Sequence, residues 1–220
     1  MASRKDQWTG AWVAKKIAAH TEVASVTIGG EHLLHIQRRK FQPVIIGTIS
    51  VDRLTVDELN HVRALFSSDI DFLVNIQREA LVDGPVLEVV EDRFGLGEYK
   101  DLLRALNEEG LRSYQNPEVS FILRGLSQHS RVSGIDRLNN RLYLVHRRIL
   151  KSVTVLALND YEITADVVRA GIATFGKGSV ILTSNPNARV TSGGNDAAIA
   201  CETTILSWKE LLGDLHKQWI

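Results

Sequence analysis

Cysteine is nearly absent from this 220-residue chain, which contains Cys201 alone. A single thiol excludes an internal disulfide framework and a metal site built from several thiolates. Proline is also scarce, with four residues, and aromatic side chains make up only 6%. Lysine and arginine balance aspartate and glutamate at 26 each, so no net charge favours a nucleic-acid or membrane partner. Composition therefore predicts a globular protein and no particular function.

Long apolar runs are missing as well. The chain begins with polar residues and lacks the apolar segment of a signal peptide. No apolar stretch approaches the length that is needed to cross a bilayer. We therefore expect a cytoplasmic protein with no membrane partner. Its oligomeric state is not indicated by the sequence.

What the chain does contain is an internal repeat. A shift of 109 positions aligns residues 12–106 with their copies, without a gap, and matches sixteen residues. The matches extend from His20 on His129 to Leu106 on Leu215. A constant offset over the length of a domain indicates duplication. We predict two domains, residues 1–109 and 110–220, that have the same topology.

Each copy predicts the same order of elements. Residues 10–20 and 117–132 have apolar side chains at helical spacing. A meander of three strands follows in each copy, with turns that are rich in glycine or asparagine. A helix capped by Thr55 or Thr164 comes next, and then a short apolar strand that is typical of buried parallel sheets. The predicted fold class is α/β, with two tandem α-β-β-β-α-β cores.

The end of the second copy is similar to a known family. The strand from Gly178 to Ser184 contains a late threonine, an alanine-rich helix follows, and a short strand leads into a helix with Leu211 and Leu212. This pattern resembles the restriction-endonuclease-like fold of the PD-(D/E)XK nucleases, and Mrr-type domains in particular. The resemblance implies two nuclease-like cores related by a pseudo-two-fold axis. It also implies a metal-binding aspartate near the second strand and an Asp/Glu/Gln-X-Lys motif on the third.

The third strands lack the residues that this chemistry requires. In that family the carboxylates hold Mg²⁺, and the lysine positions and activates the attacking water. Residues 44–50 and 153–158 contain neither a carboxylate nor a lysine. We therefore expect no catalytic residue, no metal site and no cofactor in either copy. Carboxylates elsewhere leave a relocated site open: Glu31, Asp69, Asp71 and Asp160.

Paired arginines recur at the end of the second strand, as Arg38-Arg39 and Arg147-Arg148. Consecutive strand residues face opposite ways, so one arginine of each pair can face solvent. One interpretation is a charged edge strand that resists aggregation. The other is a duplicated phosphate contact, because guanidinium binds phosphate oxygens bidentately. The second gains support from residues 112–151, where eight basic residues face two acidic ones.

We therefore hypothesise a catalytically degenerate binding protein that contacts DNA or RNA. The predicted nucleic-acid-binding residues are Arg38, Arg39, Lys40, Arg147, Arg148 and Lys151. Two other hypotheses stay open. The chain is then either a protein-interaction subunit of a restriction or defence complex, without nucleic-acid contact, or a metal-dependent nuclease with a relocated active site.

Overall fold

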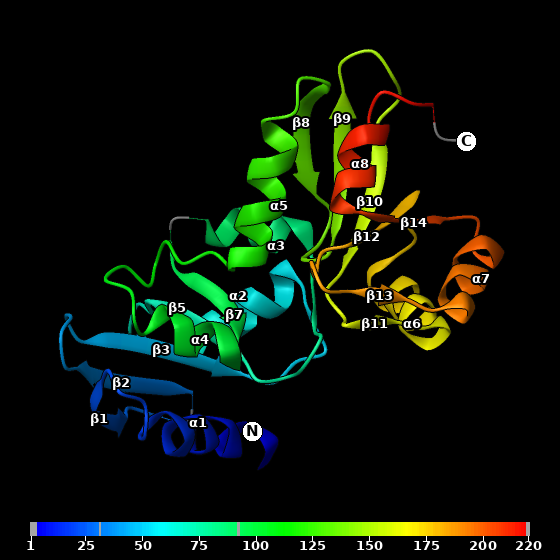
Figure 1. Cartoon of the computed structure of the whole chain (residues 1–220). Coiled ribbons are helices and arrows are strands. Elements are labelled where there is room, and N and C mark those ends of the chain that lie inside the picture. The colour runs from blue at the N-terminus through cyan, green and yellow to red at the C-terminus, as the bar shows by residue number, and fades with distance from the viewer. Residues whose placement is uncertain (1–3, 31, 92, 219–220) are drawn as a thin grey trace. The chain divides into compact units, whose positions relative to one another are not determined.

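The computed structural model describes residues 4–30, 32–91 and 93–218. The chain divides into two compact units, Met1–Asn116 (unit 1) and Pro117–Ile220 (unit 2). Each unit contains a five-stranded mixed sheet with helices around it (Figure 1). The prediction of a mixed α/β chain with two similar halves is therefore confirmed. None of the described helices is long and apolar enough to cross a membrane.

Unit 1 starts with a helix and a three-stranded meander, and then alternates helices and strands. In chain order its elements are α1 (Arg4–Ile17), β1 (Val23–Ile28), β2 (Leu33–Arg38), β3 (Val44–Ile49), β4 (Arg53–Leu54), α2 (Val56–Ala64), β5 (Phe72–Asn75), β6 (Leu81–Val82), α3 (Gly84–Val90), β7 (Gly95–Glu98) and α4 (Tyr99–Ala105). The sheet order is β1-β2-β3-β5-β7. The pairs β1–β2 and β2–β3 are antiparallel, whereas β3, β5 and β7 run parallel to one another.

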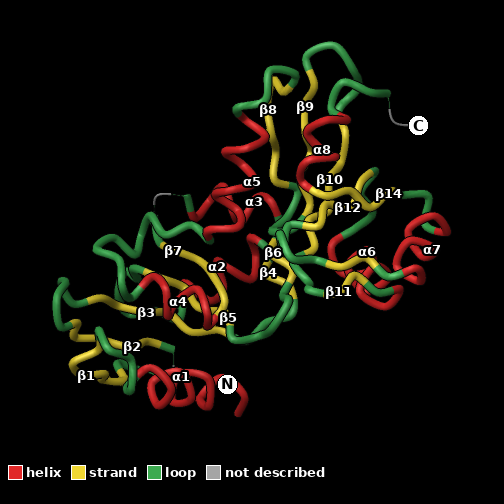
Figure 2. Tube along the Cα trace, viewed as in Figure 1, coloured by secondary structure: helices red, strands yellow, loops and turns green. Residues whose placement is uncertain are grey.

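Unit 2 repeats this arrangement, and Figure 2 shows the same alternation of helix and strand. Its elements are α5 (Pro117–Ser127), β8 (Val132–Arg137), β9 (Leu142–Arg147), β10 (Val153–Leu158), β11 (Glu162–Ile163), α6 (Ala165–Phe175), β12 (Val180–Thr183), β13 (Arg189–Val190), α7 (Ser192–Ala200), β14 (Thr204–Ser207) and α8 (Trp208–Asp214). Its sheet order is β8-β9-β10-β12-β14. Two-residue strands form an additional small parallel sheet in each unit, β4 with β6 and β11 with β13.

Helices cover both faces of the sheet in unit 1. On one face α1 and α4 pack against Phe72, in a cluster that also contains Ile17 and Leu102. On the other face α2 and α3 pack against Leu73, in a second cluster that contains Leu59. Phe72 and Leu73 are consecutive residues of β5, so their side chains leave opposite faces of the sheet. The unbroken apolar pattern of β5 is therefore that of a strand buried on both sides.

The gap-free alignment of the two copies is wrong by one residue over a short stretch. The strands of the meander begin 109 residues apart in the two units. In contrast, β5 begins at Phe72 and β12 at Val180, a separation of 108. The connection that leads into β12 is one residue shorter than its counterpart. Leu73 therefore corresponds to Ile181, and not to the identical Leu182.

The division between the units falls after Asn116, later than the predicted boundary at residue 109. Residues 110–116 pack on unit 1, where Leu111 and Tyr114 are buried in the core. Tyr114 Oη donates a hydrogen bond to Asp101 Oδ1 over 3.2 Å, and Asn116 Nδ2 donates to the same oxygen over 2.9 Å. Asp101 is buried and also closes the capping box of α4. One carboxylate thus ties this segment to unit 1.

Candidate nucleic-acid interface

The first arginine of the pair in unit 1 is buried. Arg38 ends β2, and 7% of its surface is exposed. Its Nε donates to Gln42 O over 2.8 Å, inside the hairpin that joins β2 to β3. Nη1 donates to Glu108 O over 2.5 Å and Nη2 to Glu109 O over 3.0 Å, just beyond α4. The guanidinium therefore binds backbone carbonyls of its own unit.

Arg147 makes the same clamp in unit 2. It ends β9, and 8% of its surface is exposed. Nε donates to Lys151 O over 2.7 Å, and Nη1 donates to Leu215 O and Lys217 O over 3.3 and 2.6 Å. Burial lowers the pKa of both Arg38 and Arg147 from the usual value. An arginine that starts with so high a pKa stays charged, so each clamp places a cation beside backbone carbonyls that follow the last helix of its unit.

The second arginine of each pair faces solvent, as strand alternation predicts. Arg39 and Arg148 are both exposed. Arg148 Nε donates to Ser130 O over 3.1 Å, which leaves the terminal nitrogens of its fork for another ligand. Each pair thus contains one arginine that holds the fold and one that is presented to the surroundings.

Exposed cations surround Arg148 in unit 2. We call Arg131, Arg148, Lys151 and Lys217 the basic end of unit 2. The amide of Arg148 donates to Arg131 O over 2.9 Å, and the carbonyls of Lys151 and Lys217 both accept from Arg147. Lys217 Nζ lies 2.6 Å from Asp214 Oδ1. In the part of the chain that the structure describes, the other three side chains form no ion pair.

The same place in unit 1 carries acidic residues. Glu22 stands 109 positions before Arg131, and Glu108 stands 109 positions before Lys217. Lys40 Nζ, one of the predicted contacts, lies 3.0 Å from Glu22 Oε1. Glu108 is exposed beside the clamp of Arg38. The buried arginine is thus retained in both units, whereas the charge is reversed at two of the positions around it.

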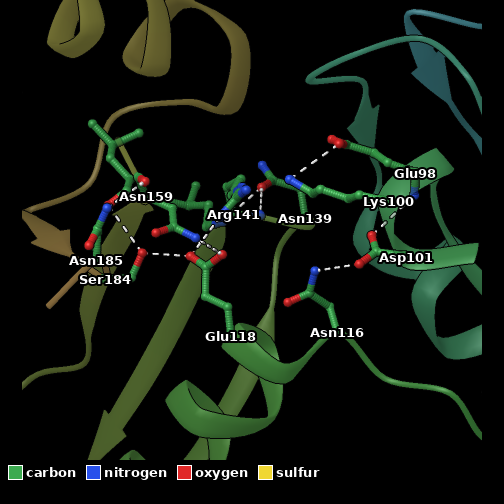
Figure 3. Close-up of polar contacts among 12 residues, drawn as sticks. Glu98, Lys100, Asp101, Asn116, Glu118, Asn139, Arg141, Asn159, Ser184 and Asn185 are labelled. Carbon is green, nitrogen blue, oxygen red and sulfur yellow. Dashed lines mark hydrogen bonds and ion pairs between the residues drawn. The ribbon is translucent and has the colours of Figure 1, made fainter. Parts of the chain in front are cut away.

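A second polar cluster lies where β10 and β12 end, with Glu118 of α5 at its centre (Figure 3). Arg141 Nη1 and Ser184 Oγ donate to Glu118 Oε1 over 2.7 and 2.5 Å. Asn159 Nδ2 donates to Glu118 Oε2 over 2.6 Å. The Glu118 side chain is 14% exposed and that of Arg141 is 23% exposed. The carboxylate is neutralised and hydrogen-bonded on both oxygens, so this cluster is a closed salt bridge.

This salt bridge lies at the start of the second strand of unit 2 and the end of the third. Arg141 directly precedes the second strand, β9, and Asn159 directly follows the third, β10. The guanidinium already supplies the positive charge that a divalent cation would bring. The corresponding residues of unit 1 include Thr9 and His32, which carry no carboxylate. Among the described residues, no group of three or more His, Cys, Asp or Glu is arranged to hold a metal ion.

Of the carboxylates considered for a relocated site, Asp71 is bound within unit 1. Glu31 lies outside the described residues. Asp71 Oδ1 accepts from Arg112 Nε over 2.8 Å, and its Oδ2 accepts from a backbone amide of β3 over 2.8 Å. Asp69 is exposed in unit 1, and Asp160 is exposed in unit 2. Both carboxylate oxygens of Asp71 therefore accept hydrogen bonds from unit 1 itself.

The identical residues of the repeat do not indicate a role for Arg131 and Lys217, because neither residue has an identical counterpart in unit 1. Aligned positions of opposite charge were the available signal, with Glu22 on Arg131 and Glu108 on Lys217. Compared with known proteins, the chain matches no family model, no curated protein and no solved structure. Function is therefore inferred from the sites themselves.

Proposed function

We propose that this chain is a catalytically degenerate, nuclease-like binding protein, and that the basic end of unit 2 contacts nucleic-acid phosphates. One observation carries the proposal. Around an arginine that is buried in both units, Glu22 and Glu108 of unit 1 are replaced by Arg131 and Lys217 in unit 2. A buried arginine that is kept, while two neighbouring acidic residues are replaced by exposed bases, supports a separate role for this surface in unit 2.

Three observations support two restriction-endonuclease-like cores without nuclease chemistry. Each unit has the α-β-β-β-α-β order, with the second strand antiparallel to its neighbours. The third strands carry no carboxylate and no lysine. The place beside the end of β10 is occupied by the Glu118–Arg141 salt bridge. We therefore propose binding without cleavage, in a restriction or defence setting.

Arg148 and Arg131 suit phosphate for a physical reason. A guanidinium fork forms two parallel hydrogen bonds with phosphate oxygens, and exposed cations release counterions when they bind a nucleic acid. The Arg147 clamp fixes the hairpin from which Arg148 and Lys151 project. Arg147 is in this view a positioning residue, and it makes no phosphate contact itself. The same distinction assigns Arg38 to the scaffold of unit 1.

The test is duplex binding, measured by fluorescence anisotropy over a salt series with labelled DNA and labelled RNA. The logarithm of the wild-type affinity should fall with log salt by about −0.9 for each phosphate contact on duplex DNA. Arg148→Ala should reduce that slope by about one unit and leave sequence preference unchanged. Arg39→Ala is the matched control, because it removes the equivalent exposed arginine of unit 1. We expect its slope to equal that of the wild type.

Other outcomes would redirect the assignment. Equal losses in Arg39→Ala and Arg148→Ala would show that both units bind, as the sequence first suggested. No binding to DNA or RNA at low salt would favour the protein-interaction subunit. Cleavage with Mg²⁺ or Mn²⁺ that disappears in Asp71→Ala or Asp160→Ala would establish a relocated nuclease site.

A further inference from the structure

An aspartate, a histidine and a serine form a hydrogen-bonded row on the sheet of unit 2. His146 Nε2 lies 2.7 Å from Asp136 Oδ2, and His146 Nδ1 lies 3.0 Å from Ser152 Oγ. Asp136 belongs to β8, His146 to β9, and Ser152 directly precedes β10. These strands are neighbours in the sheet. Three adjacent strands therefore bring the three polar groups together.

The row lies on the open face of the meander. Along β9, Tyr143, Val145 and Arg147 are buried and alternate with His146, which is partly exposed. Tyr143 and Val145 belong to the core beneath α5 and α8. His146 therefore points from the opposite face of the sheet. Its side chain is 37% exposed and that of Asp136 is 61% exposed, so a substrate can reach the row from solvent.

Hydrogen-bond chemistry assigns the proton positions. An ionised carboxylate accepts hydrogen bonds and donates none, so the bond to Asp136 requires a proton on His146 Nε2. In the neutral ring Nδ1 then carries the lone pair, and it accepts the hydroxyl proton of Ser152. A base that is oriented by a carboxylate and directed at a hydroxyl is the arrangement that activates a serine nucleophile.

The row is not required by the fold. The equivalent positions in unit 1, each 109 residues earlier, hold Thr27, Gln37 and Pro43. Unit 1 nevertheless forms the same antiparallel meander, with an irregularity at the same place in the pairing of its first two strands. The meander therefore does not need an aspartate, a histidine and a serine at these positions. Their presence in unit 2 alone calls for a chemical reason.

A hollow lies farther along β10 than the row, at Thr154. This hollow of about 630 Å³ is lined by Thr154, Lys177, Gly178, Ser179 and Glu202. Thr154 lies two residues beyond Ser152 on the same face, roughly 7 Å along the strand. Thr154 Oγ1 accepts from the amide of Ser179 over 2.8 Å, which joins the two sides of the hollow.

We propose that Ser152 is an acyl-accepting nucleophile for small carboxylic esters, with His146 as its general base and Asp136 as a positioning residue. Ser152 Oγ attacks the carbonyl carbon, and its proton passes to His146 Nδ1. The bond to the leaving alcohol then breaks, and the alcohol takes that proton from His146. Water attacks the acyl-serine in the reverse sequence, releases the acid and restores the hydroxyl. Water is the co-reactant of this sequence, which needs no oxidant and no metal.

A fluorophosphonate probe on the full chain tests this proposal, with the modified residue identified by peptide mass spectrometry. We expect one label per chain at Ser152, and no label in Ser152→Ala. His146→Gln, which introduces the residue found in unit 1, should slow labelling by about a hundredfold, because the general base is lost. Ser127→Ala, an exposed serine of α5, is the control and should label like the wild type.

A release burst with 4-nitrophenyl acetate gives an independent readout of the acyl-serine. Asp136→Asn keeps the side-chain shape, and nitrogen NMR of His146 should show loss of the single Nε2–H tautomer with slower labelling. A scaffold role for Asp136 would leave the labelling rate unchanged. Labels spread over several serines, or equal rates in wild type and a folded His146→Gln variant, would overturn the proposal.

Discussion

A buried guanidinium holds the end of the last helix in each unit. Arg38 reaches the chain that leaves α4, and Arg147 reaches the chain that leaves α8. The carbonyls that the guanidinium binds lie at or beyond the helix C-caps, so the helices supply no donors for them. A guanidinium has several N–H donors and can satisfy two of these carbonyls at once. The clamp therefore contributes to stability through hydrogen bonds to which water has little access, because the guanidinium that donates them is buried.

We predict that Arg147→Ala lowers the free energy of unfolding by about 2–4 kcal/mol, because it leaves buried carbonyls without donors. Arg148→Ala should change it by no more than about 0.5 kcal/mol, as is usual for an exposed side chain. Arg147→Lys should recover little, since a lysine lacks the planar fork. Urea unfolding followed by circular dichroism measures all three. Equal destabilisation by Arg147→Ala and Arg148→Ala would contradict these roles.

The sequence predicts that the paired arginines have different environments, but it does not predict what the buried one binds. Alternation along a strand predicts that one member faces inward. Which carbonyls that member binds depends on residues 68 to 70 positions away, and no local pattern reports them. The Glu118 cluster was missed for the same reason, because Glu118 and Ser184 are 66 positions apart. Asp136 and Ser152 lie only 10 and 6 positions from His146 in the sequence, so adjacent strands of the predicted meander carry all three residues.

At the scale of elements, the first and last helices of each unit meet through an aromatic pair. The ring centroids of Trp12 and Tyr99 are 5.2 Å apart in unit 1, and those of Phe121 and Trp208 are 5.0 Å apart in unit 2. These positions correspond, although the residues differ. In unit 2 the Trp208 ring lies against Gly125 of α5, where an added Cβ would overlap it. Glycine there permits the larger ring.

Gly125→Ala should therefore destabilise the protein by about 1–3 kcal/mol through overpacking. Helix propensity alone predicts the opposite sign, a gain of about 1 kcal/mol. Adding Trp208→Tyr, which introduces the residue found in unit 1, should restore much of the loss and reveal coupling in a double-mutant cycle. Gly213→Ala is the control in α8, because no described atom lies within 4 Å of its added Cβ. Thermal unfolding compares the wild type, Gly125→Ala, Trp208→Tyr, the double variant and Gly213→Ala. Similar shifts for both glycine variants would refute the packing explanation.

The order of the main elements followed from local chemistry. Thr55 and Thr164 both cap their helices through the side chain, as predicted. The two-residue strands β4 and β11 were not expected, because their pairing with β6 and β13 depends on the course of distant loops. The sequence does not reveal the one-residue shift at β12, because the gap-free alignment pairs Leu73 with the identical Leu182. An apolar strand buried on both faces gives no periodic signal that would fix its register.

At the scale of the whole molecule, each unit has a hydrophobic core of its own. The clusters of unit 1 draw only on its own residues, and the cluster of unit 2 does the same. We predict that residues 1–116 and 117–220, produced separately, each unfold cooperatively in urea. Residues 117–220 should keep the nucleic-acid affinity and salt slope of the full chain.

A shorter first fragment sharpens this prediction. Residues 1–109 lack Leu111 and Tyr114, which are buried in the core of unit 1. We expect this fragment to unfold at a lower urea concentration than residues 1–116, because an apolar surface and the Asp101 partners are lost. Equal stability of the two fragments would place the end of unit 1 near residue 109 after all.

The arginine clamps also bear on how the chain is made. Arg38 and its partner Glu108 are 70 positions apart, so the clamp of unit 1 closes only after nearly the whole unit has left the ribosome. Arg147 is synthesised later still, on a hairpin that resembles the first. By then Arg38 already binds the carbonyls beyond α4, so they are not available to Arg147 of the second hairpin. We expect this order of synthesis to disfavour exchange of parts between the two repeats, which is a common route to misassembly.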